Sequence, residues 1–535
     1  MTVLPRHAVG RRTVLGLAGA GAVAAATVPG PAAAAEAVFQ HGVASGDPLP
    51  GGVLLWTRVT PTPESAPGSG AGPQADVTWQ VSADAGFTTI VAAGVERTGP
   101  ERDHTVKVDV AGLRPATTYW YRFGHAGAWS PPGRTMTAPA VADTVARLRA
   151  GVVSCANWEA GYFAAYRHLA ARDDLNLVVH LGDYLYEYGT GGFSAAGKVV
   201  RATRPAHETR TLADYRIRHA HYKTDPDLQA LHASVPWVIT WDDHEVANDQ
   251  WSGGAENHTP GAEGDFAARV AAARQAYAEW MPVRLGGDGR IYRRLRYGDL
   301  FELSMLDLRS YRSQQASGTA ADADGRTIAG AEQLAWLTGG LVASDAIWKL
   351  VGNPVMISRL DVGTLPAWLI PPLAELIGVP RNGVVLNLDQ WDGYNADRER
   401  LVDALRAART EDVVFLTGDI HMSWANELTT RDTGPADPAA AEFVVPAVTS
   451  DNLNDFVGTT ALSGLAASLI RATNPHVRWV ETDGHGYGVL DVTRSRCRMD
   501  WYHLADRTDR GTAARWVQGW SVGRGSAKLR RESRP

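Results

Sequence analysis

Three apolar segments of this 535-residue chain each run directly into a cluster of ionisable side chains. Residues 235–249 read VPWVITWDDHEVAND, residues 178–187 read VVHLGDYLYE, and residues 413–421 read VVFLTGDIH. An apolar run of this length is typical of a buried strand. Carboxylates repel one another and resist burial, so such clusters need a cation or strong solvation. The pattern predicts three strands that deliver ligands from their ends to one place.

Length and composition limit the class of protein. A chain of 535 residues is too long for one average core, which predicts two or more domains. A hydrophobic content of 45% and a charged content of 21% are typical of a soluble globular protein. The net charge of −6 provides no general attraction to an anionic membrane and no platform for nucleic acid.

The N-terminus has the pattern of an export signal. Residues 10–15 read GRRTVL, a twin-arginine signature, and a weakly apolar stretch and the small residues Ala33-Ala34-Ala35 follow. We therefore expect residues 1–35 to be a twin-arginine signal peptide and the protein to be secreted through that translocation machinery; a disordered basic tail is the alternative. The two cysteines, Cys155 and Cys497, could form one disulfide in an exported protein.

The remaining chain changes character near residue 140. Residues 52–59, 77–81 and 105–110 alternate between apolar and polar side chains, and residues 113–123 resemble the tyrosine corner of a fibronectin-like sandwich. Residues 36–140 are therefore expected to form a small all-β sandwich domain. From residue 147 onward strands alternate with helices, expected at 162–171, 266–281, 332–341 and 395–409, which predicts an α/β domain over 147–510. Residues 511–535 are interpreted as a C-terminal tail.

Each polar cluster could instead have a purely structural role, such as a helix cap, ordinary packing or a capped turn. Asp183 could cap a helix and Tyr186 could be ordinary packing. Three adjacent ionisable groups at Asp243-His244-Glu245 are harder to bury without a function. Asp419 and His421 lie two residues apart and can point the same way from an extended segment. The segment at 244–248 lacks the second histidine of a zinc protease helix, and no histidine follows the GWSVG segment at 519–523, so a serine-hydrolase elbow is excluded.

Taken together, these side chains describe a mixed-ligand metal centre. A thiolate and a phenolate favour iron or another borderline metal, whereas oxygen ligands favour calcium or magnesium. Two metals that share a carboxylate can clamp a phosphoryl group and activate water. His244 then remains free to donate a proton or to stabilise the transition state. The candidate donors are Cys155, Tyr186, His421, Asp183, Asp243, Asp419, Asn248 and Asn353.

The order of short motifs resembles the PhoD-type alkaline phosphatase/phosphodiesterase family of the calcineurin-like metallophosphoesterases. The matching segments are SCANW at 154–158, GDYLYE at 182–187, WDDHE at 241–245, GNPVM at 352–356, WDGY at 391–394 and GDIHMSW at 418–424. FQHGVASGDP at 39–48 and LWTR at 55–58 resemble that family's β domain. The resemblance covers nearly the whole exported chain. Some members of that family resemble phospholipase D enzymes.

The resemblance implies an α/β four-layer (αββα) metallophosphoesterase sandwich after the β domain. It also implies roles for individual residues. Fe³⁺ would be bound by Cys155, Tyr186 and His421, Asp183 would bridge to Ca²⁺, and Ca²⁺ would be bound by Asp243, Asp419 and Asn353. His244 would be the catalytic residue, with Asp242 and Asn248 as supporting residues. A ligand role for Cys155 argues against the disulfide.

We expect a secreted, metal-dependent phosphoesterase, either an alkaline phosphatase or a phosphodiesterase. We also expect the protein to be a monomer. Its substrate would be a phosphate monoester, diester or phospholipid, and the alternative enzyme is a phospholipase D that releases phospholipid headgroups with the same site. A non-catalytic binder of phosphorylated cell-wall polymer, with structural metals, is the alternative from another class. The C-terminal tail does not have the pattern of the helix that narrows the site in some relatives, which predicts wider substrate access.

Overall fold

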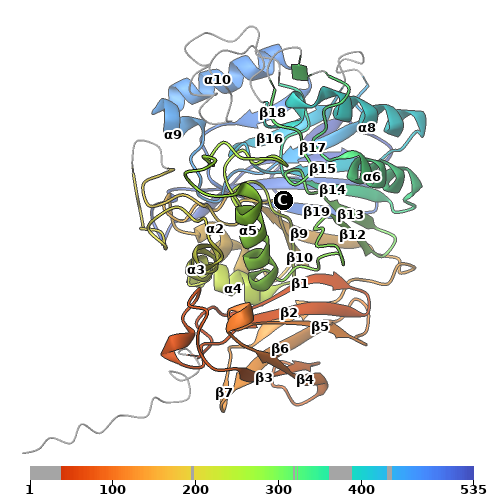
Figure 1. The fold of residues 1–535 in the computed structure, drawn as a ribbon. Helices are drawn as coiled ribbons and strands as arrows, with labels where there is room; N and C mark the ends of the chain where they lie inside the picture. The colour runs from red at the N-terminus through yellow and green to blue at the C-terminus, as the bar shows by residue number, and fades with distance from the viewer. Residues whose placement is uncertain (1–37, 194–197, 317–319, 322, 361–387, 430–436) are drawn as a thin grey trace, which may run out of the picture.

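The computed structural model describes residues 38–193, 198–316, 320–321, 323–360, 388–429 and 437–535. These residues form three β-sheets flanked by helices (Figure 1). The expected signal peptide, residues 1–35, lies outside the described residues. No helix in the described ranges combines the length and apolar content that a membrane span requires.

A ten-stranded sheet extends through most of the molecule. Its central strands are parallel: β9 (Arg147–Val153), β10 (Leu177–His180) and β11 (Trp237–Ile239). On one side it continues through the antiparallel strands β19 (Gly486–Thr493), β20 (Arg496–Leu504), β21 (Ala514–Gly523) and β22 (Leu529–Glu532). Every residue of β10 and β11 is buried, which is the reason that these segments are continuous apolar runs in the sequence.

A seven-stranded sheet lies against the first. Its parallel strands are β13 (Phe301–Met305), β14 (Trp348–Asn353), β15 (Val413–Thr417) and β17 (Ala440–Val444). The antiparallel strands are β12 (Arg293–Tyr297), β16 (Ser423–Leu428) and β18 (Val477–Glu481). One apolar cluster includes Val152 and Val179 from the first sheet and Leu303, Leu350 and Leu416 from the second, so the two sheets share a core.

Helices cover the other faces of these sheets (Figure 1). The side chains of α2 (Ala164–Ala170), α4 (Pro226–Ser234) and α5 (Phe266–Trp280) cluster with the ten-stranded sheet. Those of α6 (Ala331–Ala343) and α8 (Asn395–Ala407) cluster with β14 and β15. The helices α9 (Leu453–Val457) and α10 (Thr460–Thr473) pack near β16 and β18. The predicted mixture of strands and helices is therefore confirmed, with helix ends within a few residues of the expected ones.

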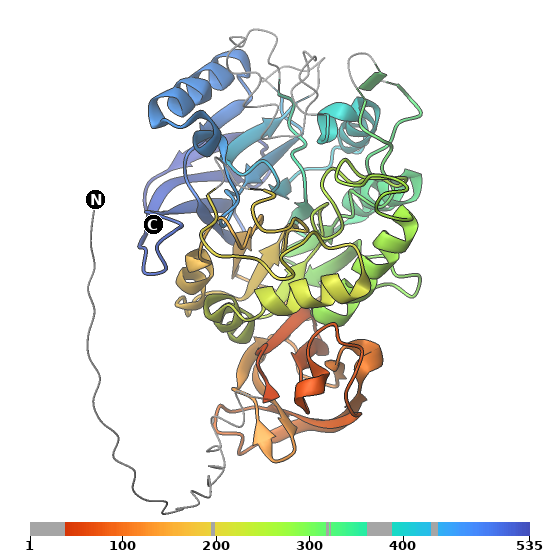
Figure 2. The ribbon, with the colours of Figure 1, turned by 60° about the vertical axis from the view of Figure 1, so that its left-hand side comes forward.

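The N-terminal region is all-β, as the alternation predicts (Figure 2). A five-stranded sheet contains β3 (Ala75–Ser82), β4 (Ile90–Thr98), β6 (Thr118–His125), β7 (Ala128–Trp129) and β8 (Gly133–Met136). The hydroxyl of Tyr119 accepts the backbone N–H of Arg114 at 3.0 Å, which is the bond of a tyrosine corner. The facing strands β1 (Val43–Leu49), β2 (Gly52–Arg58) and β5 (Thr105–Ala111) belong to the ten-stranded sheet, because β1 pairs with β11 at Gly46 and Trp237.

The C-terminal residues differ from the expected tail. Strands β21 and β22 form one edge of the ten-stranded sheet, and Val522 and Leu529 lie in the core between the sheets. The backbone N–H of Leu529 also donates to the Glu427 carboxylate at 2.8 Å. Leu529 is buried whereas both arginines that follow it in β22 are exposed, so this strand shows no regular alternation in the sequence.

Lys223 is buried where α3 (Leu212–Tyr222) ends, among aromatic and imidazole rings. Its ammonium group donates to the Tyr184 hydroxyl at 3.1 Å and lies 4.4 Å from the ring centre of Trp56. Burial lowers the pKa of Lys223 to about 7. An unfolded lysine titrates near 10.4, so the unfolded chain binds more protons between these values. The free energy of unfolding therefore increases as pH rises through this window.

We expect Lys223→Met to raise the free energy of unfolding at pH 7, because the apolar side chain carries no charge to desolvate. The advantage over the parent should fall by about 1.4 kcal/mol for each pH unit above 7. Chemical denaturation at three pH values measures this difference, with the exposed Lys528→Met as control. A difference that does not change with pH would contradict the assignment of a neutral buried lysine.

Candidate metal centre

The structure brings the predicted strand-end side chains together. Cys155 follows β9, Asp183 follows β10, His244 follows β11, and Asp419 and His421 follow β15. Because these strands are parallel within each sheet, their carboxyl ends lie at the same edge. Four overlapping sets have ligand atoms within 4.8 Å of one another: Cys155 with Asp183 and His421; Asp183 with Asp243 and His244; Asp242 with Asp243 and Asp419; and Asp243 with Asp249 and Asp389.

Tight backbone turns aim these side chains inward. Cys155, Asp183, Asp419 and His421 have φ values of 58°, 55°, 63° and 57°, in the left-handed region that side chains other than glycine rarely adopt. Gly182 has φ of 108°, and a Cβ atom there would lie 2.5 Å from Cβ of Asp242. Such conformations cost of order 1–3 kcal/mol each and persist where the surrounding structure fixes them.

The first half of the site contains Cys155, Asp183, Tyr186 and His421. The Tyr186 hydroxyl donates to Asp183 Oδ2 at 2.9 Å and lies 3.3 Å from His421 Nε2. His421 Nδ1 lies 2.7 Å from the carbonyl of Asp451, which makes Nδ1 the protonated nitrogen and leaves Nε2 as a metal donor. Within the described structure, the buried Asp183 Oδ1 has no hydrogen-bond partner.

The chemistry of these buried donors is that of a metal site, because their charges are costly to bury together without a cation. Burial, followed by the charge of Asp183, raises the pKa of the Cys155 thiol well above its usual value, and the same two causes raise the pKa of Tyr186. Burial also raises the pKa of Asp183 well above its usual value. A cation held by these residues would stabilise the deprotonated form of each donor, and the unpartnered Asp183 Oδ1 would be available to it. Sulfur, phenolate, imidazole and carboxylate together suit iron.

The second half of the site is built from carboxylates around Arg309, which is fully buried. Arg309 donates to Asp242 and lies 3.6 Å from Asp243 Oδ1 and 3.5 Å from Asp419 Oδ1. Burial alone would raise the pKa of Asp243, but Arg309 and His244 lower it to about 2. Asp243 is therefore an anion before any metal binds, and its oxygen donors suit calcium or magnesium.

Several residues of this half were not singled out in the sequence. Asp389 accepts from Arg309 Nη1 at 2.9 Å, from Arg312 Nη1 at 2.7 Å and from Gln315. Gln390 donates to Asp419 Oδ2 at 2.5 Å. Arg309 follows β13 as the ligands follow their strands, so the same strand-end signal could have identified it. Asp389 and Gln390 directly precede the WDGY motif.

His244 lies between the two halves and is held from behind by Glu187. Its Nδ1 is 2.8 Å from Glu187 Oε2, and Glu187 Oε1 accepts the backbone N–H of Asn248 at 2.7 Å and the side chain of Asn257 at 2.8 Å. Burial would lower the pKa of His244, but Asp243, Asp183 and Glu187 outweigh it and raise the pKa well above its usual value. The bond to Glu187 leaves Nε2 of the imidazolium available to the site.

The side chains of Asn353 and Asn248 differ from those of the charged donors, because they form hydrogen bonds with other protein groups. The Asn353 side chain is engaged by protein groups, because its oxygen accepts from Trp391 Nε1 at 3.1 Å and its nitrogen donates to Val355 and Thr417. Asn248 donates its side-chain amide to Glu256. Asp242 is fixed by Arg309. Glu245 supports the turn, because its carboxylate accepts backbone N–H groups of Asp183, Tyr184 and Asp242.

Both cysteines of the chain are described, and both are free. Cys155 lies in the metal-ligand cluster, whereas Cys497 is buried in β20 within the core between the sheets. The two cysteines are therefore not paired with each other, which is compatible with the ligand interpretation of Cys155.

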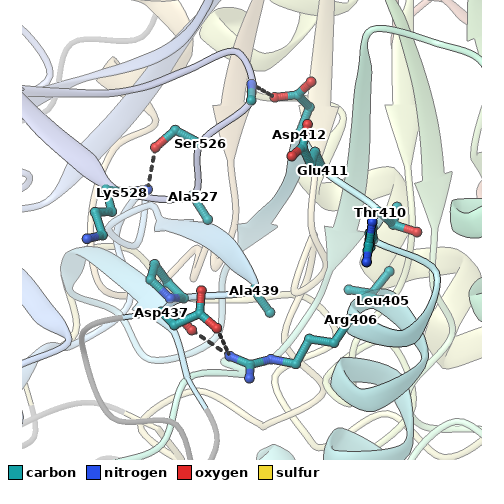
Figure 3. Close-up of a pocket in the computed structure, with 13 residues that line it drawn as sticks. Leu405, Arg406, Thr410, Glu411, Asp412, Asp437, Ala439, Ser526, Ala527 and Lys528 are labelled. Carbon is teal, nitrogen blue, oxygen red and sulfur yellow. Dashed lines mark hydrogen bonds and ion pairs between the residues drawn. The ribbon is translucent and has the colours of Figure 1, made fainter.

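A cavity of about 520 Å³ lies at the other end of β15 (Figure 3). Asp412 precedes β15 and lines the cavity, whereas Asp419 follows the same strand and belongs to the metal-ligand cluster. Arg406 and Asp437 interact across it, and the backbone of Gly525 donates to Asp412 at 2.6 Å. None of the candidate metal-ligand sets in the described ranges contains a residue of this cavity.

Comparisons with known proteins agree with this geometry. The sequence profile described as PhoD-like phosphatase matches residues 150–501, and the profile of the PhoD-like phosphatase N-terminal domain matches residues 22–139. Alkaline phosphatase D of Bacillus subtilis (strain 168) is 37% identical over 489 residues, which cover 89% of this chain and 79% of the relative. A solved structure titled "Structure of PhoD" superimposes with a TM-score of 0.83 and 35% identity, covering 93% of this chain and 92% of that chain. The chain therefore belongs to the PhoD-like phosphatase family.

Proposed function

We propose that this protein is a phosphoric ester hydrolase, an alkaline phosphatase or phosphodiesterase, that acts through the candidate metal centre. The observation that carries the proposal is the convergence of Cys155, Asp183 and His421 with Asp243, Asp419 and His244 at one strand edge. The family relationship supports the same activity. A phospholipase D activity is not favoured by the comparisons, because the related protein is described as an alkaline phosphatase.

The metals proposed for this site are Fe³⁺ and Ca²⁺. Fe³⁺ would be held by Cys155, Tyr186, His421 and Asp183, and Ca²⁺ by Asp183, Asp243 and Asp419. The side-chain oxygen of Asn353 is proposed as a further donor to Ca²⁺ through its second lone pair, because it already accepts one hydrogen bond from Trp391. When bound, such a pair supplies an activated water and neutralises charge on the phosphoryl oxygens. Asp183 is suited to a shared position because Oδ2 faces Tyr186 and Oδ1 is unpartnered in the described structure. Asp242 and Asn248 are proposed as supporting residues.

His244 is proposed as the catalytic proton donor. Glu187 holds the imidazolium through Nδ1, so that Nε2–H can donate to the leaving oxygen of the ester. Among the carboxylates that raise the pKa of His244, Glu187 is not a proposed metal ligand, so its charge favours the protonated ring when metals are bound as well. Arg309 fixes the carboxylates of Asp242 and Asp389 and so maintains the oxygen half of the site.

The finer features of the architecture belong to the same proposal. We infer a four-layer αββα arrangement in which the shared core lies between the two large sheets and α2, α4, α6 and α8 form outer layers. Residues 36–140 would form the N-terminal domain and residues 147–510 the catalytic domain. The twin-arginine motif at 10–15 supports export and secretion through the twin-arginine machinery. The protein is proposed to act as a monomer on phosphate monoesters and diesters.

Turnover should depend on bound metal. We expect purified protein to hydrolyse p-nitrophenyl phosphate and bis-p-nitrophenyl phosphate, and chelation should reduce both rates to the level of a protein-free control. Phosphatidylcholine tests the phospholipase alternative, and elemental analysis of protein purified without added metal identifies the ions. Full activity after complete chelation would refute the proposed function, and so would the absence of turnover on all three substrates.

Removal of the proposed proton donor should affect kcat. We expect His244→Gln to lower kcat by about 10²–10⁴-fold, because the leaving oxygen then departs without a proton. His207→Gln is a matched control, since that imidazole is exposed on the surface. An unchanged kcat in His244→Gln, with normal metal content, would exclude the assigned role.

Glu187 should act only through His244. We expect Glu187→Gln to lower kcat by about 10–100-fold, because the neutral amide holds the imidazolium less well. The double variant with His244→Gln should be no slower than His244→Gln alone, since both remove the same proton donor. Glu427→Gln, a buried glutamate near the β22 edge, serves as control. Independent losses in the double variant would argue against coupling of these two residues.

A further inference from the structure

The segment 449–451 passes behind three donors of the proposed iron site. It follows β17, and its backbone or side chains form hydrogen bonds with each donor residue. The carbonyl of Cys155 accepts the backbone N–H of Ser450 at 3.2 Å and lies 3.0 Å from Ser450 Oγ. The carbonyl of Asp451 faces Nδ1 of His421 at 2.7 Å. Ser450 Oγ lies 2.6 Å from the hydroxyl oxygen of Tyr186.

Ser450 is held rigidly in this position. The residue is fully buried, and its carbonyl lies 2.9 Å from Nε2 of His485. Arg507 donates to the preceding carbonyl of Thr449 at 2.6 Å and pairs with the carboxylate of Asp451. The main chain on both sides of Ser450 is therefore anchored, and the hydroxyl has little freedom to choose other partners.

The positions of the protons give Ser450 a specific role. The Tyr186 hydroxyl donates its own proton to Asp183 Oδ2 at 2.9 Å, so its oxygen is an acceptor for Ser450. Ser450 has one hydroxyl proton and two acceptors, Tyr186 at 2.6 Å and the Cys155 carbonyl at 3.0 Å. When Tyr186 is a phenolate, it carries a charge and becomes the stronger acceptor. The proton of Ser450 then lies on the bond to Tyr186.

We propose that Ser450 is a positioning residue that donates a hydrogen bond to the Tyr186 phenolate and thereby sets how strongly this oxygen donates electrons to the iron. This inference rests on the proposed metal centre. A hydrogen bond withdraws electron density from the phenolate oxygen, because it stabilises the negative charge there. Without this bond the phenolate is more electron-rich, and the phenolate-to-iron charge-transfer band moves to lower energy.

The test is the visible absorption spectrum of Ser450→Ala after iron loading. We expect the charge-transfer band to persist and to shift to longer wavelength, while the iron content per chain equals that of the parent. Ser463→Ala is the matched control, because Ser463 is also buried but its hydroxyl donates to the carbonyl of Thr460 within α10. That control should leave the band unchanged. Circular dichroism and thermal unfolding show whether both variants are folded.

Four outcomes separate this inference from the proposed function. A shifted band in Ser450→Ala alone supports the role of Ser450. An unshifted band at equal iron content overturns it, as does loss of iron from folded Ser450→Ala, since the residue would then serve assembly. Parent protein that hydrolyses p-nitrophenyl phosphate without any visible band refutes the phenolate–iron assignment, and the role of Ser450 with it, while the esterase activity itself remains established.

Discussion

The structure depends on the burial of many carboxylates in one cluster, where the carboxyl ends of strands from the two large sheets meet. Asp183, Asp242, Asp243 and Asp389 are almost fully buried, and Asp419 lies beside them. Removal of a charge from water costs several kcal/mol unless an opposite charge compensates for it. Arg309 and Arg312, both fully buried, supply part of that compensation from a single loop after β13. The remaining negative charge favours the binding of cations at this site.

This requirement also explains the backbone around the site. Parallel strands place their carboxyl ends side by side, but an extended continuation would carry Cys155, Asp183 and His421 past one another. The positive φ values at these residues turn the chain where each strand ends, and the donor atoms of all three lie within ligand distance of one another. Gly182 permits the close approach of the turn to Asp242, and Glu245 collects the backbone N–H groups that the turn exposes. The sheets, the turns and the hydrogen bonds behind them therefore all hold the donor side chains close together.

The sequence predicted the features that are local in the chain. Apolar runs that end in Asp183, His244 and His421 identified the strands and the cluster, because one segment carries both signals. The contribution of β1, β2 and β5 to the large sheet could not be read in this way, since it depends on a pairing between Gly46 and Trp237. The same limit applies to Asp389, Glu187 and Ser450, whose significance arises only from contacts with distant segments.

The two halves of the site differ in charge before any metal binds, and this difference follows from their neighbours. Asp243 is ionised because Arg309 and His244 outweigh its burial, so the oxygen half presents a ready anion. Burial, followed by the negative charge of Asp183, raises the pKa of Cys155 and of Tyr186 well above the usual values. Occupation of the sulfur and phenolate half must therefore release protons, whereas Asp243 in the oxygen half is already ionised and needs no such release. Asp183 belongs to both halves, so the ionisation of one half changes the field at the other.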